Sequence, residues 1–281
     1  EANNLALRGI VNIFKETSSK QLAFVPKIIV SSIEHESILE TCRDLGKKGT
    51  EIIYLPVDKN GVVNLKKLKN SLDERTILIS VMYANNEIGT IQPIAEISKI
   101  LQQFKKERNL VIYPLFHTDA AQAFQFLDCD ADKLGIDLMT LSAHKIYGPK
   151  GIGALFMKHT LQASGFMLHA LIAGGGQEFG LRAGTENVSS IVGFAKAVEL
   201  AVKNREGEKI RTEELKNYFW KKIKNIFPKA EKNNSEKNCL PNIINVYFPG
   251  HNSQDLLMKL DLAGIAVSSG AACSARDRKI S

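Results

Sequence analysis

Short apolar runs alternate with segments of helical length over the first part of this chain, and this alternation limits the folds it can adopt. Residues 77–81 are apolar at nearly every position, as expected for a strand covered on both faces of a sheet. Strands that alternate with helices predict an α/β fold with a mainly parallel sheet flanked by helices. The predicted strands are 28–30, 52–55, 77–81, 111–116, 138–141 and 154–157, and the predicted helices are 34–47, 65–72 and 93–106.

The pattern becomes looser after residue 157. Glycine-rich loops are expected at 174–176 and 182–187, and Thr185 is placed to cap an apolar helix over 188–202. That helix is expected to continue into a charged helical segment, 209–226.

A smaller unit is expected at the end of the chain. The sequence therefore predicts a large domain over 1–202 and part of a small α+β C-terminal domain over 203–281. The smaller unit would contain a strand at 243–248, a helix at 253–262 and an apolar run at 265–267.

Composition indicates a globular protein, since 44% of the 281 residues are hydrophobic and 24% are charged. The net charge of +7 is spread over surface helices, so an acidic partner is only weakly indicated, and no direct contact with nucleic acid is expected. The sequence has neither an apolar run long enough to span a bilayer nor a signal-peptide pattern. We therefore expect a cytoplasmic protein with no membrane partner.

The four cysteines are Cys42, Cys129, Cys239 and Cys273. They form no Cys-x-x-Cys pair and show no zinc-binding spacing, so neither a disulfide framework nor a metal site is expected. Thiols that stay reduced remain available for thiol chemistry.

One loop carries a candidate nucleophile. Residues 141–153 read as the end of a strand, a loop with Lys145, and a glycine- and proline-containing turn into the next strand. A lysine held against packed strands loses solvation, which favours the neutral amine that attacks carbonyl groups. Pyridoxal 5'-phosphate (PLP) requires such a lysine for its Schiff base. Taken alone, however, this loop fits an ordinary solvated lysine better.

Polar clusters at 31–36, 83–89 and 117–122 also follow predicted strands. In a parallel sheet these clusters would gather with Lys145 at the carboxyl edge, where ligands bind. Asp119 ends a strand with almost no charge, so it needs a cationic partner to stay ionised, and a protonated pyridine nitrogen would serve. An equally good interpretation makes Asp119 the N-cap of a helix that begins near Ala120.

Five ordered motifs make the chain resemble a known family. They lie at 85–89, 117–122, 144–151, 182–187 and 268–273. Together they resemble the PLP-dependent cysteine desulfurases of the NifS/IscS type, within the class V aminotransferases. The resemblance implies a PLP fold type I large domain with a sheet of the seven-stranded type.

The resemblance also implies a PLP site. Lys145 matches the lysine that binds the cofactor covalently, and Asp119 matches the acid at the pyridine nitrogen. Gln122 matches a donor to the ring oxygen, and Asn86 matches a residue beside the ring and the substrate. His35 matches the histidine stacked on the ring, although a histidine that merely starts a helix is the plainer interpretation.

Further matches concern the phosphate and the sulfur. Ser142 and His144 match phosphate ligands of the same subunit, whereas Thr185 matches one that reaches the phosphate of the other subunit and so implies a homodimer. Cys273 matches a nucleophile on a mobile loop. The other three cysteines are interpreted as small buried apolar residues.

The implied activity is removal of sulfur from L-cysteine, which yields L-alanine and a persulfide on Cys273, with protons carried by Lys145 or His35. The sulfur would serve iron–sulfur cluster assembly or tRNA thiolation, through a sulfur-acceptor or iron–sulfur scaffold protein. The resemblance implies a chain truncated at both ends. Relatives carry a phosphate loop ahead of Glu1 and, beyond Ser281, an arginine for the substrate carboxylate.

Alternative functions remain open at this stage. A selenocysteine lyase, or another class V aminotransferase-fold enzyme, would share Lys145, Asp119 and His35, and the latter would not need Cys273. An inactive truncated scaffold would not need the lysine, aspartate and histidine together. A nucleotide-binding Rossmann protein fits less well, because the glycines at 148–153 precede a strand instead of opening a helix.

Overall fold

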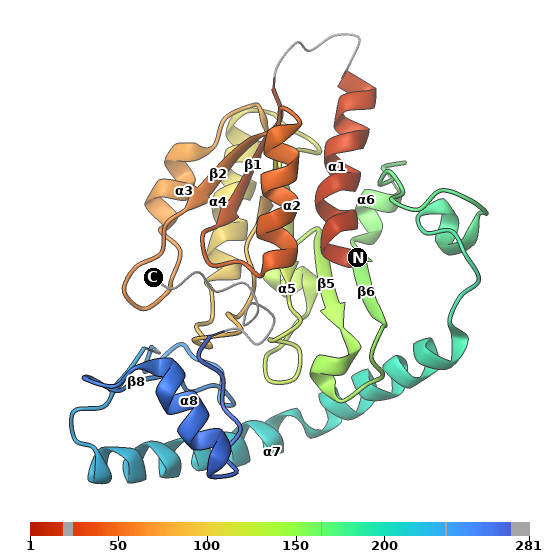
Figure 1. The fold of residues 1–281 in the computed structure, drawn as a ribbon. Coiled ribbons are helices and arrows are strands. Elements are labelled where there is room, and N and C mark those ends of the chain that lie inside the picture. Colours follow the sequence, from red (N-terminus) through yellow and green to blue (C-terminus); the bar gives the residue numbers. More distant parts are fainter. Residues whose placement is uncertain (19–24, 164, 234, 271–281) are drawn as a thin grey trace.

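A central six-stranded sheet organises the molecule in a computed structural model, which describes residues 1–18, 25–163, 165–233 and 235–270 (Figure 1). The strand order is β2-β1-β3-β4-β5-β6, and all neighbours are parallel except the antiparallel pair β5 and β6. The α/β prediction is confirmed, but the sheet has six strands in the described residues, not the seven of the expected type. The stretch between β6 and α7 (Val188–Ile226) forms short helices and loops, so it adds no seventh strand to this sheet among the described residues. The strands are β1 (Lys27–Ser31), β2 (Glu51–Leu55), β3 (Thr76–Ser80), β4 (Leu115–Asp119), β5 (Leu138–Ser142) and β6 (Gly153–Met157).

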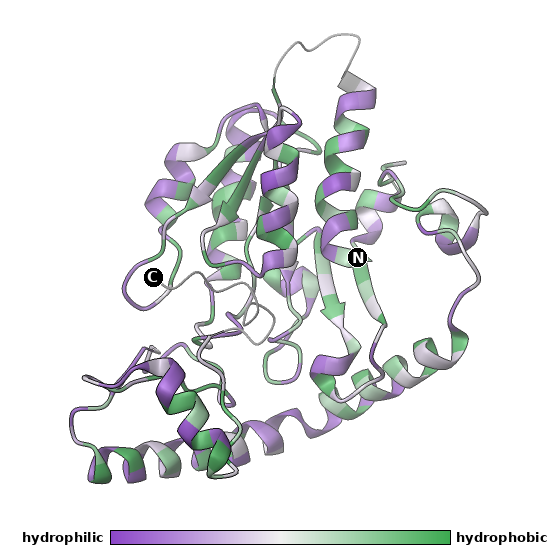
Figure 2. Ribbon diagram, viewed as in Figure 1, coloured by the Kyte–Doolittle hydropathy of each residue, from purple (hydrophilic) through white to green (hydrophobic). Residues whose placement is uncertain are grey.

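Helices cover both faces of this sheet, and each face has its own buried core. In β1, Ile28 and Val30 face one core while Ile29 faces the other, because successive side chains of a strand point to opposite sides. Figure 2 shows hydrophobic strands enclosed by helices of mixed character. One face carries α1 (Ala2–Ser18), α2 (Glu36–Lys47) and α6 (His159–Ala163), and the other carries α3 (Leu65–Ser71), α4 (Ile94–Glu107) and α5 (Ala131–Leu134).

Helix α1 was not predicted, although its sequence has the required period. Leu7, Ile10, Val11 and Phe14 recur every three or four residues and are buried on the sheet. Arg8 of α1 pairs with Asp44 of α2, which ties the two helices together. Helix α1 thereby brings its first turn close to the start of α2.

Strand β4 begins later than predicted. The sequence favoured 111–116, but the side chain of Val111 is 91% exposed and the strand starts at Leu115. Pro114 has no backbone N–H to donate to a neighbouring strand, so regular pairing begins after it. The shift of the strand places Asp119 at its final position.

Helix α7 (Val188–Ile226) is one continuous helix of 39 residues along the lower edge of the molecule (Figure 1). The predicted continuation past residue 202 is therefore confirmed, and the proposed domain boundary at 202/203 falls within the helix. The predicted cap was wrong, because Asn187 and not Thr185 accepts the hydrogen bond from Ser190 N. Asn187 directly precedes the helix, which places its short side chain within reach of that N–H.

The C-terminal unit, which follows α7, contains less β-strand than its apolar runs predicted. Only Val246–Tyr247 (β8) of the predicted strand 243–248 is a strand, and it pairs with β7 (Glu231–Lys232). Residues 265–267 form no strand, because the structure shows no neighbouring strand for them to pair with in its described part. Helix α8 (Ser253–Leu262) has the predicted bounds. Over the described ranges, the structure contains no helix that is both long and apolar enough to cross a membrane.

Candidate functional site

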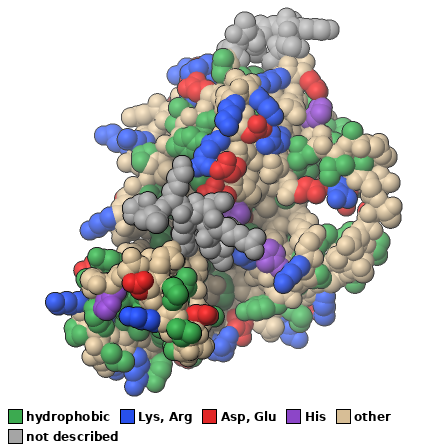
Figure 3. All heavy atoms as spheres, viewed as in Figure 1, with side chains coloured by type: hydrophobic (Ala, Val, Ile, Leu, Met, Phe, Trp, Pro, Cys, Tyr) green, Lys and Arg blue, Asp and Glu red, His purple; other side chains and the backbone are tan. Residues whose placement is uncertain are grey.

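The segments after β1, β3 and β4 meet at the carboxyl edge of the sheet. Tyr83 N donates to Asp119 O at 2.9 Å, and Asn85 Nδ2 donates to Ile33 O at 2.9 Å. Because these strands are parallel neighbours, the segments that follow them are brought together, as the sequence indicated. On the face drawn in Figure 3, histidine and basic side chains gather between the sheet and the C-terminal unit.

Asp119 is held by neutral donors at this edge. Its side chain is 7% exposed, Oδ1 accepts from Ala121 N at 2.9 Å, and Oδ2 accepts from Asn3 Nδ2 at 2.7 Å. The residues that follow form turns and not the α-helix that one interpretation required. Hydrogen bonds to a carboxylate favour its charged form, so two N–H donors stand where a cationic partner was expected.

Glu34 is a second buried acid nearby, and its importance was missed in the sequence. Burial raises the pKa of Glu34 well above its ordinary value, and the charge of Asp119 raises it further, against the opposing hydrogen bond from Met82 N. That bond is 2.6 Å long and reaches Oε1, while Oε2 has no partner among the described residues. The two acids therefore differ: burial favours the neutral form of Glu34, whereas Asp119 accepts a hydrogen bond at each of its two oxygens.

His35 caps helix α2, as the plainer interpretation proposed. Its Nδ1 accepts from Ser37 N at 3.1 Å and lies 2.8 Å from Ser37 Oγ. A backbone N–H only donates, so Nδ1 is an acceptor and the proton of the neutral ring sits on Nε2. In this arrangement Nε2 is a hydrogen-bond donor.

His117 of the third polar cluster points into the sheet. Its ring lies 2.8 Å from Ser80 Oγ and 3.0 Å from Thr140 Oγ1, on the two neighbouring strands. Burial lowers the pKa of His117 to about 3, so the ring is neutral. We infer that His117 stabilises the three central strands.

Lys145 lies on a short 3₁₀ turn, η1 (Ala143–Ile146), directly after β5. Ala143 and Ile146 are buried, while His144 and Lys145 face outward and are exposed. Packing within this chain therefore leaves Lys145 in contact with water, contrary to the expected desolvation. Its amine forms no hydrogen bond or ion pair with any residue that the structure describes, so it is available to a ligand.

The same turn offers groups that suit a phosphate. Ser142 Oγ lies 3.0 Å from His144 Nδ1. Partial burial lowers the pKa of His144, and the charges of Lys145 and Lys150 lower it further. The turn therefore has a positive potential beside a hydroxyl and an imidazole, which is a donor set that suits an anion.

The remaining predicted residues are less constrained. Gln122 and Asn86 are half-buried in the turns after β4 and β3, and their side chains form no hydrogen bond within the described residues. Thr185 is exposed in the loop before α7. Cys273 lies outside the described residues.

Two of the other three cysteines fit their interpretation as small buried apolar residues. Cys42 and Cys129 are buried, and burial raises the pKa of each thiol to about 12. Cys239 is half-buried, with its Sγ 3.5 Å from Ile88 O. Thiols with a raised pKa are poor nucleophiles near neutral pH, so neither Cys42 nor Cys129 is a candidate for sulfur chemistry.

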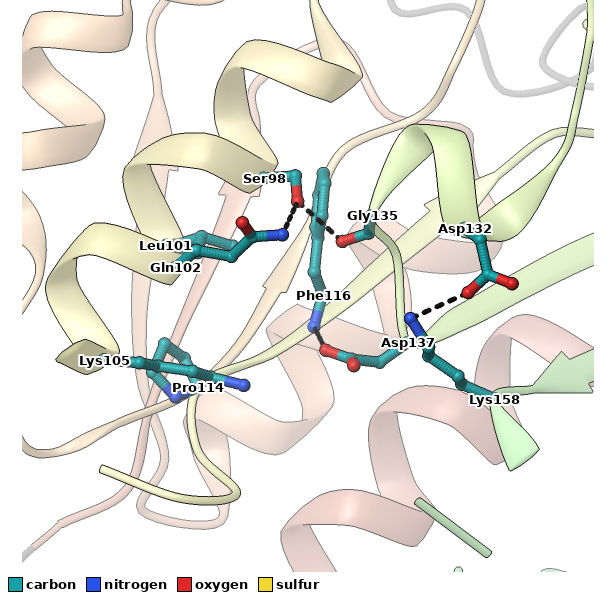
Figure 4. Close-up of a pocket in the computed structure, with 10 residues that line it drawn as sticks. All are labelled: Ser98, Leu101, Gln102, Lys105, Pro114, Phe116, Asp132, Gly135, Asp137 and Lys158. Atoms are coloured by element: carbon teal, nitrogen blue, oxygen red, sulfur yellow. Dashed lines mark hydrogen bonds and ion pairs between the residues drawn. The ribbon is translucent and has the colours of Figure 1, made fainter. Parts of the chain in front are cut away.

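A small pocket of about 130 Å³ lies at the opposite, amino edge of the sheet (Figure 4). Its charged groups include Lys158 and Asp132, whose side chains pair at 2.9 Å, and Lys105, whose pKa burial lowers. None of the predicted site residues lines this pocket. In a parallel sheet the ligand-binding edge is the carboxyl edge, so the pocket is distinct from the candidate site.

The fold and the lysine turn define a class of protein. The chain belongs to the class-V aminotransferase family, whose model matches residues 3–280. This family is PLP-dependent. Among curated proteins, the chain is similar to cysteine desulfurase IscS of Dictyoglomus turgidum, with 44% identity over 98% of this chain and 64% of that protein. It is also similar to a putative cysteine desulfurase, IscS 1, of Bacillus subtilis, with 41% identity over 98% of this chain and 67% of that protein.

Solved structures agree with these relatives. One described as a NifS-like protein matches with a TM-score of 0.84 and 36% identity, over 95% of this chain and 68% of that one. The chain thus spans about two thirds of the length of the relatives it matches, and 64% in the case of the Dictyoglomus protein.

Proposed function

We propose that this protein is a PLP-dependent cysteine desulfurase. The observation that carries the proposal is the exposed amine of Lys145, which has no partner within the described part of the chain and lies at the sheet edge where buried Asp119 also ends its strand. Relatives that carry the name cysteine desulfurase support the choice of reaction.

The described residues fit PLP. The amine of Lys145 suits its aldehyde, the charge of Asp119 suits a protonated ring nitrogen, and the positive turn at His144 suits its phosphate. When bound, PLP supplies an electron sink that weakens bonds at the α and β carbons of an amino acid. The residues proposed to hold it are Lys145, Asp119, Gln122, Asn86, His35, Ser142, His144 and, from a second copy of the chain, Thr185.

Two residues would handle protons and sulfur. In the neutral ring of His35, Nε2 already carries a proton, so it can donate a hydrogen bond but cannot take a proton from the substrate. We therefore assign the proton transfers to the amine of Lys145. The thiolate of Cys273 would attack the sulfur of L-cysteine, forming an S–S bond as the C–S bond breaks. The carbon then takes a proton to give L-alanine, and Cys273 keeps the persulfide.

The proposed assembly is a homodimer in the cytoplasm. It would pass sulfur to an acceptor or iron–sulfur scaffold protein, for cluster assembly or tRNA thiolation.

The first test concerns the cofactor. The protein is loaded with PLP, reduced with borohydride and digested, and the peptides are mapped. We expect the pyridoxyl label on Lys145, and Lys150 on the same loop is the internal control. A label on Lys150, or no label on a loaded protein, would exclude the assignment.

The second test separates a desulfurase from other enzymes of the family. Replacing Cys273 by Ser should leave PLP binding and the absorbance change on adding L-cysteine intact, but abolish alanine release, because a hydroxyl is a far poorer nucleophile toward sulfur. Alanine release at the parental rate would favour a lyase that needs no protein nucleophile. A strong preference for L-selenocysteine in the parent would favour the selenocysteine lyase.

A further inference from the structure

Asn3, in the first turn of α1, places one amide group between Asp119 and His35. Its Nδ2 donates to Asp119 Oδ2 at 2.7 Å and to Ser37 Oγ at 2.8 Å. Ser37 Oγ in turn lies 2.8 Å from His35 Nδ1. One buried side chain therefore connects the candidate acid to the candidate imidazole.

The carboxylate of Asp119 fixes the orientation of the Asn3 amide, because it can accept a hydrogen bond from the NH₂ group but has none to donate to the oxygen. If the group were flipped, its oxygen would face the carboxylate of Asp119, which accepts and does not donate. Both N–H groups of Asn3 are thus used, one for Asp119 and one for Ser37. The amide oxygen is buried and has no partner among the described residues, which costs stability. The two hydrogen bonds that Asn3 donates offset this cost.

Donor and acceptor can be assigned for each hydrogen bond from Asn3 through Ser37 to His35. Ser37 Oγ accepts from Asn3, so its single proton is free to point at His35 Nδ1. The backbone N–H of Ser37 points at the same nitrogen. Asp119 is equally constrained, since Ala121 N holds its other oxygen. The carboxylate and the imidazole therefore share one rigid set of donors.

We propose that Asn3 is a positioning residue that aligns Asp119 and His35 for the cofactor ring. This inference rests on the proposed function, because both residues are assigned to PLP. Asn3 donates to the carboxylate oxygen that Ala121 leaves free, and it orders the hydroxyl that supports the imidazole.

The neighbouring residue Asn4 offers a matched control. It lies in the same turn of α1, is half-buried, and its Oδ1 accepts from Arg8 Nε and Thr41 Oγ1, both at 2.9 Å. Those partners lie on α1 and α2, away from Asp119. An Asn4→Ala variant loses comparable helix contacts without touching the candidate site.

The experiment compares Asn3→Ala, Asn3→Asp and Asn4→Ala with the parent, using two measurements. PLP affinity is measured by absorbance titration, with thermal unfolding of the cofactor-free proteins as the measure of stability. The ring nitrogens of His35 are observed by NMR without cofactor. We expect Asn3→Ala to weaken PLP binding about tenfold and to shift the His35 signals, while Asn4→Ala does neither.

Asn3→Asp separates hydrogen bonding from packing. It keeps the shape of the side chain but turns a donor toward Asp119 into an acceptor, so we expect weaker PLP binding than in Asn3→Ala. Binding closer to the parent than that of Asn3→Ala would indicate a packing role and overturn the proposal. If Asn3→Asp does not fold, the comparison of Asn3→Ala with Asn4→Ala decides, and equal effects on both measurements overturn the proposal. If the parent itself binds no PLP, the proposed function fails, and the His35 signals still show whether Asn3 orders the imidazole.

Discussion

Buried polar residues at the candidate site differ in how many donors they receive. Asp119 accepts two N–H bonds, whereas Glu34 accepts one and leaves an oxygen unpartnered among the described residues. The Asp119 carboxyl, which is assigned to the cofactor ring, thus receives more hydrogen bonds than the Glu34 carboxyl beside it. Hydrogen bonds of this kind stabilise a carboxylate, and burial without them favours the neutral acid.

Glu34→Gln should stabilise the protein increasingly as pH rises. The pKa of Glu34 is raised above 4.5 in the folded state, so above pH 4.5 the unfolded chain loses a proton that the folded chain keeps. Parental stability is therefore lost between pH 4.5 and the folded pKa, by up to about 1.4 kcal/mol per pH unit. Glutamine is neutral throughout and escapes this loss.

Urea unfolding of both proteins at pH 5 and pH 7 measures the gain from Glu34→Gln. Exposed Glu36, two residues away, provides the control variant Glu36→Gln. An equal gain from Glu34→Gln at both pH values would contradict the raised pKa of Glu34.

At the scale of elements, the apolar runs predicted the strands well. A strand that is buried on both faces is apolar along its own short stretch of sequence, so it can be recognised without knowing its neighbours. The run at 77–81 became Thr76–Ser80, and the carboxyl-edge clusters followed from parallel order. The late start of β4 depended on Pro114, and the cap of α7 depended on which polar residue adjoined the helix. Asn3 was not predictable in this way, since its partners lie 34 and 116 residues away along the chain.

Helix α7 packs closely against the loop of the lysine turn at Gly193, where a side chain would not fit. A Cβ added to Gly193 would lie 2.7 Å from Pro149 Cγ, whereas one added to Gly207 would meet nothing within 4 Å. We expect Gly193→Ala to destabilise the protein by about 1–3 kcal/mol and to weaken PLP binding, because Pro149 and the adjoining turn must shift. Gly207→Ala should stabilise it by about 0.5–1 kcal/mol, since alanine favours a helix.

Thermal unfolding and PLP titration of the two glycine variants test this expectation. If both variants gain stability and bind PLP equally, α7 does not constrain the lysine turn.

At the scale of the whole molecule, the proposed site would be completed by a second copy of the chain. Thr185 is exposed and is not the residue that caps α7, so its side chain is available to a group from a second copy. If it reaches a phosphate in the other subunit, Lys145→Ala and Thr185→Ala protomers should complement each other. A mixed dimer would contain one site with both residues intact and one site with neither.

The two variants are mixed under conditions that exchange subunits, and alanine release is measured. We expect activity well above that of either variant alone, approaching half of the parental value per mixed dimer. Activity no greater than the average of the separate variants would place Thr185 in the same subunit as Lys145. Parental PLP occupancy in a monomer, seen by sedimentation, would contradict the shared site.

The unbroken length of α7 links distant parts of the chain mechanically. From Gly193, where the helix meets the turn of Lys145, to Ile226, where the C-terminal unit begins, it extends about 50 Å at the usual rise per residue. A tilt of about 5° at the first point would move the second by about 4 Å. A rigid α7 would therefore couple the packing beside the lysine to the position of the C-terminal unit.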